Sequence, residues 1–151
     1  MKVELGSRDG IRLGDQEEAE DALLYAMKQE WSTTLVRQYG YVHSVNATRQ
    51  LARAESWLIA HPEDPQLLLC LGRLSAREKM WGKARDYFES CYRLEHSAEV
   101  CAELGRLLTG LGEPNVAAAY FREGLLLRED TLPELPMPDK IVSDSRLLAR
   151  P

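Results

Sequence analysis

The tetrapeptide Leu71-Gly72-Arg73-Leu74 occurs again as Leu104-Gly105-Arg106-Leu107, 33 residues further along the chain. The same offset relates five more pairs of positions: Ala84 and Ala117, Tyr87 and Tyr120, Phe88 and Phe121, Cys91 and Gly124, and Leu94 and Leu127. One offset shared by this many positions indicates an internal repeat, and a period of this length is typical of stacked helical units.

Each copy of the repeat predicts two helices. Apolar residues at helical spacing predict helices over 66–78 and 82–94 in one copy, and over 99–111 and 115–127 in the other. The turns between them lie at 79–81 and 112–114. Gly112 favours the end of a helix, and Pro114 suits a first helical turn because its missing N–H breaks no hydrogen bond there. We therefore expect an all-α chain.

These positions resemble the tetratricopeptide repeat (TPR), a helix–turn–helix unit of 34 residues. The resemblance implies an all-α, TPR-type solenoid in which antiparallel helix pairs form a right-handed superhelix. Small residues then allow close approach of helices, and the aromatic residues fill the space between repeats. The positions assigned in this way are Gly40, Gly72, Ala84, Phe88, Gly105, Ala117 and Phe121.

The repeat sets the expected domain boundaries. Residues 1–15 form a poorly defined N-terminal segment, and the TPR domain covers 16–127. It consists of a leading half-repeat over 16–31, with Asp15 as the expected N-cap, and repeats over 33–62, 65–94 and 98–127. In repeat 33–62 we expect a first helix over 34–44, with Tyr39-Gly40 at the Leu-Gly position, and a second over 51–60.

Residues 128–151 are expected to form a proline-rich tail. Pro133, Pro136 and Pro138 prevent a helix and predict an extended or mobile segment. Packing of this tail into a groove of the repeat domain is an open alternative.

Composition limits the possible environment and partners. The chain has 151 residues, enough for about one domain, and its net charge of −5 disfavours binding to nucleic acid. No apolar run, residues 67–71 included, is long enough to span a bilayer. Three cysteines without a C-x-x-C pair are typical of buried thiols in a reducing compartment, so we expect a cytoplasmic environment.

A narrower resemblance involves residues 54–58, His61-Pro62, 67–69, 71–74, residues 81–85 (Trp-Gly-Lys-Ala-Arg) and the Leu-Pro-rich tail. Over roughly residues 16–138 the chain is similar to the C-terminal TPR region of the proteobacterial HemY family. The resemblance implies a fragment of a haem-biosynthesis-associated inner-membrane protein, on the cytoplasmic side, without its N-terminal membrane helices. The unrelated flavin-dependent protoporphyrinogen oxidase of that name is not implied, because no G-x-G-x-x-G sequence follows a strand.

Residue types that commonly carry catalysis form no recognisable motif. His43, His61 and His96 lack zinc-ligand spacing, and His61 and His96 are expected at the ends of second helices, where they meet unpaired carbonyls. We expect Cys91 in the core, and Cys70 and Cys101 on first helices near the groove. The sequence predicts no enzyme, catalytic residue, metal site or cofactor.

Two further groups have structural interpretations. The acidic residues Glu17, Glu18, Glu20 and Asp21 are expected at a solvated helix start. The tryptophans Trp31, Trp57 and Trp81 are expected in core or inter-repeat contacts.

First helices line the concave face of a TPR array, so the resemblance also assigns a partner-binding groove. Its residues are Arg37, Gln38, Tyr41, Gln66, Leu69, Cys70, Arg73, Arg77, Glu103 and Arg106, with Glu99 and Ala102 on the same wall. Arg73 and Arg106 lie one repeat apart, and Arg37 extends their row. Two interpretations remain open: the arginines bind acidic groups of a partner, or they pair with Glu103 and neighbouring acids as a solvated face.

The expected function is a non-catalytic scaffold that binds another protein or a peptide, such as a haem-pathway enzyme, in this groove. One alternative is a tetrapyrrole-binding or enzymatic component of haem synthesis, with arginines holding porphyrin propionates. A second alternative is a general TPR adaptor unrelated to haem.

Overall fold

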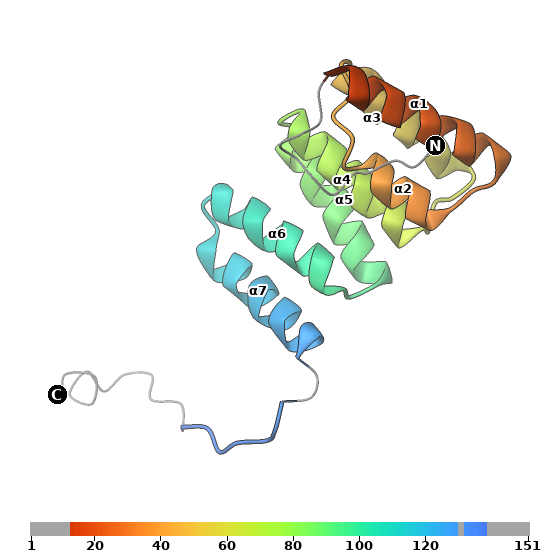
Figure 1. Ribbon diagram of the computed structural model, residues 1–151. Coiled ribbons are helices and arrows are strands. Elements are labelled where there is room, and N and C mark those ends of the chain that lie inside the picture. The colour runs from red at the N-terminus through yellow and green to blue at the C-terminus, as the bar shows by residue number, and fades with distance from the viewer. Residues whose placement is uncertain (1–12, 130–131, 139–151) are drawn as a thin grey trace.

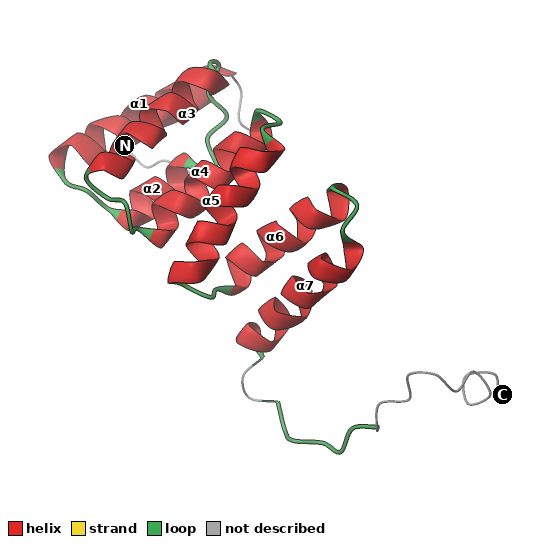
Figure 2. Cartoon of the chain, turned by 180° about the vertical axis from the view of Figure 1, so that it is seen from behind, coloured by secondary structure: helices red, strands yellow, loops and turns green. Residues whose placement is uncertain are grey.

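The computed structural model describes residues 13–129 and 132–138 (Figure 1). Its helices are α1 (Leu13–Gln29), α2 (Thr33–Tyr39), α3 (Ala47–Ser56), the 3-10 turn η1 (Trp57–Ile59), α4 (Pro65–Arg77), α5 (Trp81–Leu94), α6 (Ala98–Gly110) and α7 (Pro114–Arg128). The described residues form helices and loops without a strand, which confirms the all-α prediction (Figure 2).

Residues 65–128 form two helical hairpins, α4 with α5 and α6 with α7. Each observed helix begins and ends within one residue of its prediction. Asp64 caps α4 by accepting hydrogen bonds from the Gln66 and Leu67 N–H groups, and Ser97 caps α6 through the Val100 N–H. Pro65 and Pro114 occupy first-turn positions, as expected for Pro114.

Small residues hold the two helices of each hairpin close together. A Cβ placed on Gly72 would lie 2.3 Å from the Phe88 ring, and one on Gly105 would lie 2.4 Å from the Phe121 ring. Ala84 is fully buried. Phe88 therefore fills space within its own hairpin as well as between repeats, whereas Phe121 was expected between repeats and is 38% exposed at the end of the array.

Two hydrophobic cores share helix α4. The first includes Leu23 of α1, Val36 of α2 and Leu51 of α3, packed against Leu67, Cys70, Leu71 and Leu74 of α4. The second contains Leu68 and Leu69 of α4, Ala84, Phe88 and Cys91 of α5, and Val100 and Leu104 of α6. Eight α4 residues are buried in total, so this helix is enclosed on opposite faces.

The first half departs from the predicted repeat. α2 ends at Tyr39 instead of continuing to residue 44, and the second helix begins at Ala47 instead of residue 51. Gly40 is the C-cap of α2, and it approaches Cys70 of α4. α2 and α3 each pack on α4 and do not form a hairpin like the two later ones.

The α2 helix is short because its end is capped by side chains distant in sequence. The buried Gln50 carboxamide donates to the Tyr39 and Val42 carbonyls at 3.2 and 2.8 Å, and Arg77 donates to the Gly40 and Val42 carbonyls at 2.9 and 2.7 Å. The bonds to Tyr39 and Gly40 satisfy carbonyls that a helix continuing to residue 44 would pair internally. No residue next to the end of α2 in the sequence predicts these hydrogen bonds.

The structure tests the predictions for the two ends of the chain only in part. Asp15 lies inside α1, in its first turn, and so is not the predicted N-cap. Residues 1–12 of the expected N-terminal segment and residues 130–131 and 139–151 of the tail lie outside the described residues. Residues 132–138 are non-helical, as the prolines predict. None of the described helices combines the length and apolar composition required to cross a bilayer.

Candidate functional site

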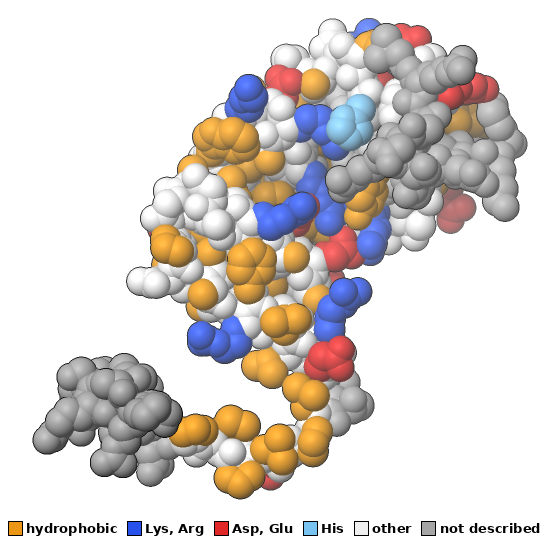
Figure 3. All heavy atoms as spheres, turned by 60° about the vertical axis from the view of Figure 1, so that its left-hand side comes forward, with side chains coloured by type: hydrophobic (Ala, Val, Ile, Leu, Met, Phe, Trp, Pro, Cys, Tyr) orange, Lys and Arg blue, Asp and Glu red, His pale blue; other side chains and the backbone are white. Residues whose placement is uncertain are grey.

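Five charged side chains from three helices form a continuous chain of ion pairs, which we call the first-helix network. Arg37 of α2 lies 2.6 Å from Glu99 of α6, and Arg73 of α4 lies 2.9 Å from Glu99 and 2.6 Å from Glu103. Arg106 pairs with Glu103 one turn away. Spacings of four and three residues place the α6 members on one helix face. Basic and acidic side chains also lie beside one another across the middle of the face in Figure 3.

Arg73 is the centre of the first-helix network. Its side chain is 14% exposed, its Nε and Nη2 donate to two carboxylates, and its guanidinium lies 5.0 Å from the centre of the Tyr41 ring. Burial alone would lower the pKa of Arg73, but the hydrogen bonds to Glu103 and Glu99 outweigh it and raise the pKa. Arg73 thus connects α4 to α6 and has little capacity left for a ligand.

Glu103 is the most buried carboxylate of the network, with its side chain 8% exposed. Burial would raise its pKa, but hydrogen bonds from Arg106 and Arg73 outweigh burial and lower it. Glu103 is therefore held in the charged form by two guanidinium groups.

The outer members of the network face solvent. The Arg37 side chain is 44% exposed and that of Arg106 is 68% exposed, and each pairs with one carboxylate. A guanidinium has five N–H donors, so both retain donors that point toward solvent. All three arginines of the row pair with neighbouring acids, which was one of the two interpretations. Arg37 and Arg106, at the two ends of the network, are exposed and have N–H donors left for a ligand.

Arg77, predicted as a groove residue, has a structural role. It donates to two carbonyls at the end of α2, and burial lowers its pKa. It is therefore engaged in holding α2 on α4.

The remaining predicted groove residues fall into two classes. Tyr41 is exposed, while Gln38 and Gln66 are half-buried. Leu69 and Cys70 are buried at 2% and 1% exposure, so their assignment to a partner-contacting wall is wrong. The reason is that α4 is covered on both faces, Leu69 by the second core and Cys70 by α2.

The histidines at the ends of second helices stack on aromatic rings. His61 lies over Trp31 with ring centres 3.7 Å apart, and His96 lies over Tyr92 at 4.0 Å. His96 also lies 3.2 Å from Glu123. The side-chain contacts of both histidines are thus with rings and, for His96, with a carboxylate of α7, where contact with helix-end carbonyls was predicted.

The tryptophans divide between packing and exposure. Trp31 and Trp57 contact the first core, as expected, and Trp31 donates to Asp64 at 3.3 Å. Trp81 is 44% exposed at the first residue of α5, outside both cores.

The three cysteines are buried thiols, as the sequence indicates for Cys91. Burial raises the pKa of Cys70 and of Cys91 to about 12, and that of Cys101 to about 11. Cys91 donates to the Pro65 carbonyl at 3.3 Å. Thiols in this state are poor nucleophiles, and Cys101 lies in the interior, away from the groove where it was expected.

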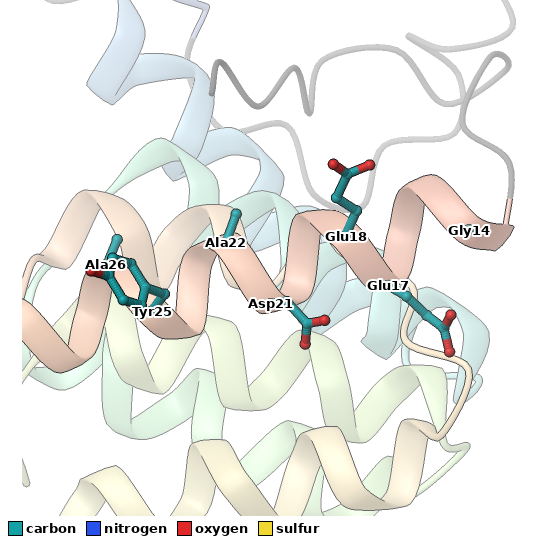
Figure 4. Close-up of a pocket in the computed structure, with 7 residues that line it drawn as sticks. All are labelled: Gly14, Glu17, Glu18, Asp21, Ala22, Tyr25 and Ala26. Carbon is teal, nitrogen blue, oxygen red and sulfur yellow. The ribbon is translucent and has the colours of Figure 1, made fainter.

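A shallow depression on α1 gathers acidic side chains without forming a site. Glu17, Glu18, Asp21 and Tyr25 line it, and all come from one helix and point in different directions (Figure 4). Over residues 13–129 and 132–138, no group of three or more potential ligands is arranged to hold a metal ion.

Sequence reasoning missed a buried polar cluster between α1, α2 and α3. Glu20, predicted at a solvated helix start, is 8% exposed, accepts a hydrogen bond from the Tyr39 hydroxyl at 2.9 Å and lies 3.2 Å from Arg53. The apolar residues Ala19, Leu23 and Met27 follow one another at helical spacing, and this pattern could have indicated that the adjacent face of α1 points inward.

No family model matches the chain, and no curated protein matches it at a significant level.

Proposed function

We propose that the chain is a TPR-type solenoid that acts as a non-catalytic protein-interaction module and binds an acidic segment of a partner protein. The observation that carries the proposal is the first-helix network, which joins α2, α4 and α6 across one surface. Its core positions the helices, and its ends, Arg37 and Arg106, present free guanidinium donors. The resemblance to the HemY family further suggests a role beside late haem synthesis at the inner membrane.

In this proposal each arginine has a distinct task. Arg73 is the internal tie, because two carboxylates already occupy it. Arg37 and Arg106 are the ligand contacts, because both are exposed and are held by a carboxylate before the partner arrives. Preorganised side chains lose little conformational entropy on binding, which favours affinity.

The test measures binding of a fluorescein-labelled peptide of alternating glutamate and serine by fluorescence anisotropy. The variant Arg37→Ala/Arg106→Ala is expected to weaken binding at least about tenfold, since charge-assisted hydrogen bonds contribute about 1.5–3 kcal/mol each. The matched control is Arg122→Ala/Arg128→Ala, which removes the same charge from exposed positions on α7. It should leave the affinity unchanged.

Two outcomes contradict the proposal. Equal losses in both double variants would show unspecific attraction by net charge. A shifted Soret band on titration with haem, without binding of the peptide, would favour a tetrapyrrole ligand instead.

A further inference from the structure

Helix α7 has an uncovered apolar stripe where the array ends. Phe121 and Leu125 are 38% and 66% exposed, and Ala118 is also exposed. The three residues are spaced by three and four positions, so they lie along one face of the helix. Hydrophobic side chains are spread over the part of the molecule from which the tail leaves, and they continue along the tail (Figure 3).

The repeat shows what happens to the equivalent stripe one unit earlier. Arg85, Phe88 and Tyr92 of α5 occupy the positions of Ala118, Phe121 and Leu125. There the next hairpin covers the stripe: Phe88 packs in the core with Val100 and Leu104, and it is 2% exposed. The stripe on α7 thus continues an interface that the chain already uses between hairpins.

The two stripes differ in the chemistry of the cover they require. On α5, Arg85 pairs with Glu113 at 2.7 Å, and the Tyr92 hydroxyl donates to Glu123 at 2.5 Å. On α7, alanine and leucine replace Arg85 and Tyr92. A cover for α7 therefore needs apolar side chains and no acidic partner at these points.

Residues 132–138, Leu-Pro-Glu-Leu-Pro-Met-Pro, meet this requirement. Leu132, Leu135 and Met137 are 59%, 63% and 73% exposed. A polyproline II segment has three residues per turn, so Leu132, Leu135 and Pro138 share one edge. The fixed φ of the prolines limits the entropy lost on docking, and their missing N–H groups leave fewer donors unpaired against an apolar surface.

Length and position also match. The stripe from Ala118 to Leu125 spans roughly 10 Å at the helical rise. In polyproline II, Leu132 and Leu135 lie roughly 9 Å apart along the segment, so both can reach the stripe. The segment begins three residues after Glu129, and the Leu132 N–H donates to the Glu129 carbonyl at 3.4 Å. In both ribbon views it then runs back below α7, separated from the helix (Figures 1 and 2).

Charge adds a third match. Arg122 and Arg128 are exposed on either side of the stripe and pair with no acidic side chain among the described residues. Glu134 lies between the two leucines of the tail.

We propose that residues 132–138 dock in extended form along the Ala118–Phe121–Leu125 stripe of their own chain and close the end of the array. The two-residue link from Glu129 keeps the segment and the stripe close together, which favours docking within one chain over capture of a second molecule. This inference is independent of the first-helix network and its ligand.

The test uses the full chain and combines three measurements. Amide ¹⁵N relaxation of Leu132, Glu134, Leu135 and Met137 is expected to show the same restricted motion as the helices, and the Leu135 methyl groups should give nuclear Overhauser contacts to the Phe121 ring. The variant Leu132→Ser/Leu135→Ser should release the segment and lower the melting temperature by about 2–4 °C.

The matched control is Leu126→Ser, an exposed apolar residue on another face of α7, which should leave the motion of the segment unchanged. Free motion of the four amides in the unmodified chain would overturn the proposal. Sedimentation velocity provides the remaining distinction. A dimer that the tail variant dissociates would show that the stripe binds the tail of a second copy, which would also overturn docking within one chain.

Discussion

Gly72 has no room for a methyl group, because a Cβ there would lie 2.3 Å from the enclosed Phe88 ring. We expect Gly72→Ala to lower the free energy of unfolding by about 1–3 kcal/mol in urea titrations, despite the better helix propensity of alanine. Gly105→Ala should cost less, since the exposed Phe121 can move away. Gly82→Ala is the control, because nothing lies within 4 Å of its Cβ position. Equal stabilities for the Gly72 and Gly82 variants would mean that Phe88 moves freely.

The lowered pKa of the single residue Glu103 leads us to expect that the stability of the chain depends on pH. Its pKa is below the ordinary value of a glutamate, so its contribution is fully present above that ordinary value, near pH 4.5, and is lost as the pH falls through the folded-state pKa. In Glu103→Gln we expect lower stability at pH 7 and a shallower loss between roughly pH 5 and 3. Melting temperatures across this range provide the measurement. Parallel curves for both proteins would contradict the coupling.

At the scale of elements, the two hairpin turns differ at one equivalent position. Lys79 between α4 and α5 and Gly112 between α6 and α7 both have positive φ, 62° and 81°. Left-handed backbone costs a residue with a side chain roughly 1 kcal/mol, whereas glycine adopts it freely. Lys79→Gly should therefore stabilise the chain by about 1 kcal/mol, and Gly112→Lys should destabilise it similarly. Chemical denaturation of both variants tests this, and shifts of the same sign would refute it.

The helices that were predicted correctly from the sequence are those that begin and end at turn-forming residues close by in the sequence. Gly112 and Pro114 mark the turn between α6 and α7, and the 33-residue offset aligns α4 and α5 with these helices. α2 was predicted too long because Gln50 and Arg77, 10 and 37 residues after Gly40, cap it. The arginine row was likewise visible in the sequence, but its pairing with Glu99 and Glu103 depends on how α6 lies against α2 and α4. Burial of Leu69 and Cys70 depends on the same packing.

For the whole molecule, neighbouring hairpins stabilise one another. Removing residues 98–151 would uncover Leu68, Leu69 and Phe88, which α6 now encloses. The α4–α5 hairpin would then lack the cover of its second core, so we expect this truncated chain to lose helical circular dichroism and to aggregate. The substitution Leu104→Ser in the full chain should weaken the same interface while keeping the chain length. A truncated chain that stays monomeric and fully helical would contradict this dependence.

Helix α4 contributes side chains to both cores. Neither half can unfold without exposing part of this helix, and so the loss of one half lowers the stability of the other. The array should consequently behave as a single cooperative unit that frays inward from α1 and α7, with the amides of α4 the last to exchange with solvent. The rate at which α4 unfolds should thereby limit the global unfolding of the helices that precede it and of those that follow it.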